Sequence, residues 1–142
     1  MTSPRKPYRL LPHTADVRFR VQGRSFADLL SKAVFALFDQ CVDAARVSAK
    51  ATKKIDLRAQ SPEEALVRLL QEALFLFDAK GFVARSLKFS VYKEGHLTGR
   101  LAGERFDPKK HRPKSEIKAA TFHGLKIRKR AGLWSAEIVL DV

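Results

Sequence analysis

The sequence lacks the features of a disulfide-stabilised, secreted or membrane-spanning protein. It holds one cysteine, Cys41, so no disulfide can form within the chain, and a cytoplasmic location is expected. No apolar run approaches the ~20 residues that a transmembrane helix needs. The basic residues of the N-terminus are not followed by an apolar stretch, so neither a signal peptide nor a membrane partner is expected.

The chain also lacks the usual catalytic and zinc-binding motifs. Its histidines, His13, His96, His111 and His123, stand without an HxxxH or CxxC arrangement. There is no Gly-rich phosphate loop, no dinucleotide-binding fingerprint and no nucleophile paired with a base. Cys41 falls on an apolar helical stripe, which predicts a small buried side chain rather than a nucleophile. The sequence therefore offers no catalytic residue.

Acidic residues are scarce relative to basic ones. The chain has 28 Lys and Arg residues against 15 Asp and Glu, a net charge of +13. Residues 104–130 alone carry ten basic and three acidic side chains. Such a segment suits RNA, a nucleotide or an acidic protein partner, but it also suits a solvated surface that keeps the protein in solution. Charge alone leaves these interpretations open.

Two segments have the periodicity of amphipathic helices. The first runs from about Phe26 to Cys41 after Ser25, a good N-cap. The second begins at residues 61–64, where Ser-Pro-Glu-Glu combines a cap, a proline at the first helical position and a capping-box glutamate. It ends at residues 80–81, where a glycine permits a left-handed turn.

The remaining apolar segments alternate as strands do. At one of them, Leu87, Phe89 and Val91 are predicted to face the core, and residues 105–114 are predicted to form a basic loop. The predicted strands are 8–11, 17–21, 53–57, a segment around 87–91, 97–104, 116–123, 125–129 and 134–140. The order predicts a single α+β domain, residues 1–142, with two helices on one face of a mixed, mainly antiparallel β-sheet.

Two aspartates stand at strand ends. Asp16 precedes one strand and Asp141 ends another, both away from the apolar positions. If these strands pair antiparallel the carboxylates are neighbours, whereas parallel pairing would separate them by roughly 17–20 Å. The terminal carboxylate on Val142 adds a third negative group, and such a cluster suits a hard cation, Ca²⁺, Mg²⁺ or Mn²⁺. Turn caps or plain surface charges are the alternative interpretation.

Four segments, in this order, resemble the archease family: His13-Thr14-Ala15-Asp16, Gly103-Glu104, Lys118-Ala119-Ala120-Thr121-Phe122-His123 and Val139-Leu140-Asp141-Val142. The resemblance implies an archease-like α+β fold and a protein that is not itself an enzyme. Archeases assist the RNA-splicing ligase RtcB, which joins RNA 3′-phosphate or 2′,3′-cyclic phosphate ends to 5′-hydroxyl ends. They promote its Mn²⁺-dependent guanylylation by GTP and allow multiple turnover.

The resemblance also implies a site. In the family a metal, with Ca²⁺ the first expectation, is held at the positions of Asp16, Asp141 and Val142. Lys118 is expected to contact a nucleotide, a phosphate or a ligase carboxylate, and Glu104 and His13 are further candidate contacts. A solvated strand lysine, a strand-end acid and a turn histidine are the simpler interpretations of these last three residues.

Two other functions remain open. A basic RNA-binding module acting without a ligase partner would explain the charge, although most of the ten phenylalanines fall on predicted core stripes and not on an exposed stacking surface. A metal-dependent hydrolase built on Asp16 and Asp141 would lack a third side-chain ligand and an evident base. The basic balance exceeds what the resemblance leads us to expect, so direct contact with RNA stays an open alternative.

Overall fold

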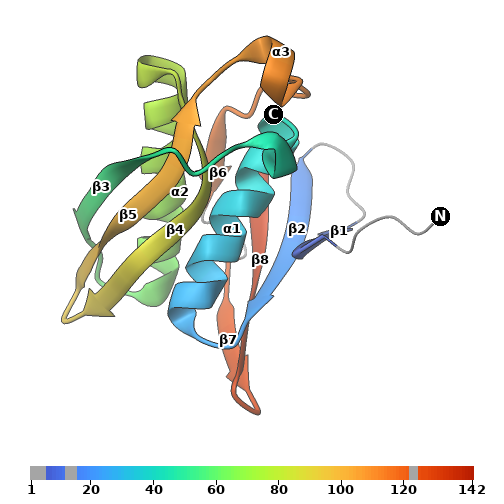
Figure 1. Ribbon diagram of the computed structural model, residues 1–142. Helices are drawn as coiled ribbons and strands as arrows, with labels where there is room; N and C mark the ends of the chain where they lie inside the picture. Colours follow the sequence, from blue (N-terminus) through green and yellow to red (C-terminus); the bar gives the residue numbers. More distant parts are fainter. Residues whose placement is uncertain (1–5, 12–15, 122–124) are drawn as a thin grey trace.

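The fold is of the predicted α+β class, with its strands divided between two antiparallel sheets (Figure 1). The computed structural model describes residues 6–11, 16–121 and 125–142. The first sheet has the order β1-β2-β8-β6, with β7 also paired to β8, and the second has the order β3-β5-β4. The first comprises β1 (Tyr8–Leu11), β2 (Val17–Gly23), β6 (Ala119–Thr121), β7 (Ile127–Arg130) and β8 (Leu133–Asp141). The second comprises β3 (Ala51–Arg58), β4 (Phe82–Lys93) and β5 (His96–Arg105).

The two long helices begin and end where the sequence predicts. Helix α1 spans Phe26–Cys41, and the Ser25 hydroxyl accepts the backbone N–H of Asp28. Helix α2 spans Pro62–Lys80, and Gly81 ends it with a left-handed φ of 66°. Both helices contact strands of both sheets. The helices therefore join the two sheets around one contiguous core, which contains the buried side chains of α1, α2 and the inner faces of the strands.

The start of α2 is held by a pair of side-chain caps. The Ser61 hydroxyl accepts the N–H of Glu64 at 3.1 Å, and the Glu64 carboxylate accepts the N–H of Gln60 at 3.2 Å. Each cap satisfies a backbone donor that has no partner within the helix. The predicted capping arrangement is thus present, with the glutamate reaching one residue further back than the cap residue itself.

We expect Ser61→Ala to lower the free energy of unfolding by about 1 kcal/mol, because the N–H of Glu64 loses its acceptor. Thermal unfolding followed by circular dichroism would measure the change. Ser61→Asp keeps an acceptor at the same position and should retain most of the stability. Equal losses in both variants would show that the cap contributes nothing.

Two predicted segments differ from the structure for identifiable reasons. Residues 105–114 are not wholly a loop, because α3 (Pro108–His111) forms there, capped by the Asp107 carboxylate. In β4 only Leu87 of the predicted inward residues is buried; Phe89 and Val91 are 83% and 57% exposed. A β-bulge between Lys88 and Val91 turns the later residues to the opposite face.

Close backbone packing explains a glycine in β5. A Cβ atom at position 103 would overlap the carbonyl oxygen of Val83 on β4. Only glycine therefore allows β4 and β5 to approach this closely beside the bulge between Ala84 and Ser86.

Among the residues described, no helix has the length and apolar character required to traverse a bilayer.

Candidate functional site

The strands that carry the two aspartates are neighbours and run antiparallel. In the β2–β8 pairing Val17 lies opposite Leu140, so Asp16 and Asp141 occupy the next positions at the same end of the sheet. Figure 1 shows β2 beginning close to the chain end that follows β8. Asp16 is half-buried and Asp141 is exposed. The pairing on which a shared site depends is therefore the antiparallel one.

Lys118 reaches the same end of the sheet from the opposite side of β8. Its backbone N–H donates to the carbonyl oxygen of Asp141 at 2.8 Å, and Ala119 lies opposite Asp141 in the β6–β8 pairing. The Lys118 side chain is exposed, and Val142 beyond it is 47% exposed. Residues from three of the four sequence motifs thus lie together at the end of the first sheet where β2 begins and β8 ends.

The remaining predicted contacts are placed differently. Glu104 lies on β5, in the second sheet, and its side chain is buried. His13 lies outside the described residues, so its predicted contact stays a prediction. Cys41 is buried, as expected, and loss of hydration raises the pKa of its thiol to about 12, which excludes a reactive thiolate at neutral pH.

Glu104 is the centre of a hydrogen-bonded network near α3. Its Oε2 accepts from the Lys110 ammonium at 2.7 Å, from the Ser48 backbone N–H at 2.7 Å and from His111 Nε2 at 2.9 Å. Burial alone would raise the pKa of this carboxyl. The hydrogen bonds from Lys110, Ser48 and His111 outweigh burial and lower the pKa to about 2. These contacts account for Glu104 within the fold, without a partner.

The tautomer of His111 follows from its two neighbours. The ring is fully buried, and its Nδ1 accepts the backbone N–H of Asp107 at 2.9 Å. Because Nδ1 is an acceptor, the proton lies on Nε2 and is donated to Glu104. The sequence predicted His111 to lie in a basic loop. The signal for its contact was its position four residues after Asp107, the residue that caps α3.

A second buried acid, Asp39, was not identified from the sequence. Its carboxylate accepts from the Tyr8 hydroxyl at 2.7 Å, from Lys6 at 3.0 Å and from the backbone N–H of Ala44 at 3.1 Å. Burial opposes ionisation, but the bonds from Tyr8, Lys6 and Ala44 lower the pKa of Asp39 below its usual range. Lys114 lies 3.5 Å away. Asp39, near the end of α1, therefore links that helix to β1 through Tyr8 and to the segment before β6 through Lys114.

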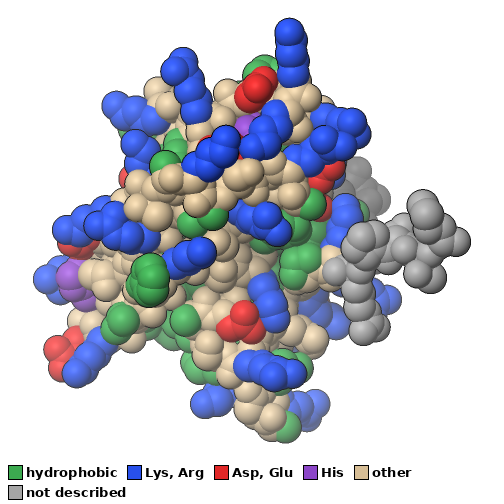
Figure 2. Space-filling view, in the orientation of Figure 1, with side chains coloured by type: hydrophobic (Ala, Val, Ile, Leu, Met, Phe, Trp, Pro, Cys, Tyr) green, Lys and Arg blue, Asp and Glu red, His purple; other side chains and the backbone are tan. Residues whose placement is uncertain are grey.

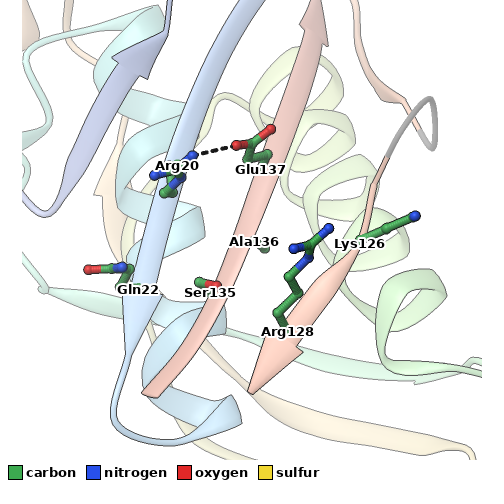
Figure 3. A pocket seen from close by; sticks show the side chains of 7 residues that line it. All are labelled: Arg20, Gln22, Lys126, Arg128, Ser135, Ala136 and Glu137. Carbon is green, nitrogen blue, oxygen red and sulfur yellow. Dashed lines mark hydrogen bonds and ion pairs between the residues drawn. The ribbon is translucent and has the colours of Figure 1, made fainter. Parts of the chain in front are cut away.

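The outer face of the first sheet carries a basic hollow. Arg20 on β2 and Arg128 on β7 flank β8, and Lys126 precedes β7 (Figure 3). The hollow has a volume of about 350 Å³. Arg20 is ion-paired with Glu137 at 2.6 Å, which leaves two of the three cations without an acid in the lining. The hollow suits an anion, and it lies on the strands that end in the aspartate pair.

The donor set at the aspartate pair can be compared with what a metal requires. Across the described parts of the chain, no three His, Cys, Asp or Glu residues lie close enough together to hold a metal ion. Asp16 and Asp141 supply two carboxylates, so a third protein ligand must come from elsewhere, such as the carboxylate on Val142. A set made only of oxygen donors fits Ca²⁺, Mg²⁺ or Mn²⁺ and does not fit zinc.

Comparison with known sequences decides the family. The sequence model of the Archease protein family matches residues 8–142. The chain belongs to the archease family. A Pyrococcus furiosus archease is 36% identical over 134 residues, covering 92% of this chain and 94% of the relative. A Methanosarcina barkeri archease is 32% identical over the full length of both chains. The predicted family is therefore confirmed.

Solved archease structures share the fold. The solution structure of Methanobacterium thermoautotrophicum protein 1598 is 28% identical and covers 97% of this chain and 100% of its own, with a TM-score of 0.78. A Thermotoga maritima protein described as an archease and possible chaperone is 22% identical, with full coverage of both chains and a TM-score of 0.64. The latter likeness concerns the fold alone, and together they confirm the predicted archease-like architecture.

Proposed function

We propose that this chain is an accessory activator of an RtcB-type tRNA-splicing and RNA-repair ligase, with no catalysis of its own. The observation that carries the proposal is the meeting of Asp16, Lys118 and Asp141 at one edge of the first sheet. These are the residues to which the family resemblance assigns the metal and the adjacent contact. Asp16 precedes β2, Lys118 precedes β6 and Asp141 ends β8, yet all three lie at one end of the first sheet.

The aspartate pair would hold a divalent cation. Asp16 and Asp141 would each supply a carboxylate and Val142 its main-chain carboxylate, and Ca²⁺ is the expected ion, with Mg²⁺ or Mn²⁺ as alternatives. A bound cation would neutralise the mutual repulsion of these groups and offer positive charge to a phosphate or a ligase carboxylate. Lys118, exposed beside Asp141, would orient the same anionic group through its ammonium.

The positive charge that faces the ligase would come mainly from the first sheet. The basic segment 105–114 was expected to supply it, but Lys110 is bonded to Glu104 and Lys114 to Asp39. Arg20, Lys126 and Arg128 around the hollow are better placed, because Arg20 lies on β2, which Asp16 precedes, while Arg128 lies on β7 and Lys126 before it, beside β8, which ends at Asp141. Activation would arise because the chain binds the guanylylation-competent conformation of the ligase more tightly than the inactive one.

A guanylylation assay tests this proposal directly. An RtcB-type ligase is incubated with Mn²⁺ and labelled GTP, with and without the chain, and the covalently labelled ligase is quantified over time. We expect faster labelling and more than one ligation per ligase molecule when the chain is present. An unchanged rate with the ligase of the same organism would refute the proposal, and turnover of RNA by the chain alone would refute its non-catalytic role.

A further inference from the structure

The second sheet carries an exposed aromatic residue in a strained conformation. Phe89 is 83% exposed, and its φ of 56° lies in the left-handed region. For an L-residue with a large side chain this backbone conformation is unfavourable. Exposure and strain are both unfavourable for folding, so the fold itself gives no reason for a phenylalanine at this position.

The bulge in β4 directs this side chain outward. On either side of it Lys88 pairs with Arg100 and Val91 pairs with Thr98, so Phe89 and Ser90 together oppose Gly99. Bulges and lysines commonly protect edge strands, and β4 is an edge strand. That protection explains the bulge and Lys88. It does not explain Phe89, because an exposed aromatic ring makes an edge strand more prone to associate with another chain.

A row of three cations crosses the sheet beside Phe89. Lys54 on β3 lies opposite Arg100 on β5, which in turn lies opposite Lys88 on β4. Like charges in directly opposite positions are destabilising. Lys54 has Asp56 at 3.9 Å, but neither Arg100 nor Lys88 forms an ion pair with any residue in the described ranges. The positive charges of Arg100 and Lys88 are therefore not neutralised by an acid among the described residues.

The aromatic ring and the cations surround one hollow. A depression of about 280 Å³ is lined by Phe89, Arg100, Lys54, Thr98, Ile55 and Gly99. Figure 2 shows basic side chains around a hydrophobic patch over β4 on this face of the molecule. An exposed ring on which a base can stack, beside cations that can pair with phosphates, is the combination that binds single-stranded nucleic acid.

We propose that the outer face of the β3-β5-β4 sheet binds single-stranded RNA, with a base stacked on Phe89 and phosphates paired with Arg100, Lys54 and Lys88. The choice of RNA over DNA rests on the proposed function, in which the ligase joins RNA ends. The face is defined by Phe89, Arg100, Lys54 and Lys88, independently of that function. It lies on a different sheet from the aspartate pair, so RNA could be held by one sheet while the other engages the ligase.

The test measures RNA binding by the chain alone, without ligase, using fluorescence anisotropy of a labelled 12-nucleotide single-stranded RNA. Phe89→Asn removes the ring and places a residue that tolerates a left-handed φ, so the fold should be kept or slightly stabilised. We expect binding about tenfold weaker or more. Phe75→Ser, on an exposed phenylalanine of α2, is the matched control and should leave binding unchanged.

Salt dependence identifies the phosphate contacts. Arg100→Gln should reduce the slope of log affinity against log salt by about 0.7, the value for one phosphate contact to a single strand. Arg128→Gln, in the hollow of the first sheet, should leave the slope unchanged.

The proposal is overturned if the chain binds no RNA, if Arg128→Gln weakens binding while Phe89→Asn does not, or if polyglutamate binds instead. Tighter binding of DNA of the same sequence would overturn the choice of RNA. None of these outcomes alters the guanylylation result.

Discussion

Asp16→Asn is expected to reduce the stimulation of ligase guanylylation to the level of the ligase alone. The substitution keeps the shape of the side chain but removes one of two carboxylates at the candidate cation site, and oxygen-ligated divalent cations depend on that negative charge. Asp16 precedes the first pair of the β2–β8 ladder and forms no ion pair within the described segments. Its loss should therefore leave the fold intact. Labelled-GTP transfer to the ligase measures the effect.

The matched control is Asp78→Asn, which changes the same charge at an exposed position of α2, outside the β2–β8 pair. It should stimulate like the unaltered chain. Calorimetric titration with Ca²⁺ and Mn²⁺ separates binding from activation, and Asp16→Asn should lose the binding that Asp78→Asn retains. Normal stimulation by Asp16→Asn would refute the cation-positioning mechanism. Equal loss in both variants would point to net charge instead.

Glu104→Gln should be the most destabilising of the substitutions considered, by about 2–4 kcal/mol, or roughly 10 °C in melting temperature. The neutral amide cannot accept three charge-reinforced hydrogen bonds, and it leaves Lys110, the Ser48 N–H and His111 poorly satisfied in a buried place. Chemical denaturation at neutral pH would measure the loss. Glu116→Gln, at an exposed position with no ion pair in the described segments, should change stability little.

Acid titration gives an independent measurement of the same network. The pKa of Glu104 is lowered from 4.5 to about 2 in the folded chain, so the folded state binds the proton less readily than the unfolded state. The contribution of Glu104 to stability is therefore complete above about pH 4.5 and is lost as the pH falls toward 2. Glu104→Gln should flatten this part of the stability profile. An unchanged profile would show that Glu104 is not held ionised by these contacts.

The sequence predicted elements and family better than it predicted contacts. Caps such as Ser25 and Ser61 are local signals, and the helix bounds followed from them. The division into two sheets could not be predicted, because alternation identifies the buried face of a strand but not its neighbour. The sequence predicts that Asp16 and Asp141 are neighbours only if their strands pair antiparallel, and antiparallel and parallel strands have the same alternation.

Side chains that depart from local patterns were the ones misplaced. Phe89 fits an inward alternation, and only the bulge that follows Lys88 turns it to the surface. His111 and Lys110 have the composition of a solvated loop, yet they are directed inward by Glu104, an acid on the preceding strand. In both cases the deciding interaction is made between strands or across a turn, where periodicity carries no information.

Because the two carboxylates proposed to hold a cation belong to residues 16 and 141, the site cannot exist before β8 has been synthesised. A ribosome must release the last strand before the first strand of the pair has its neighbour. Cation occupancy would then report that β2 and β8 have paired, and the ion would draw the folding equilibrium toward that paired state by mass action. Truncated products would be unable to compete for the ligase.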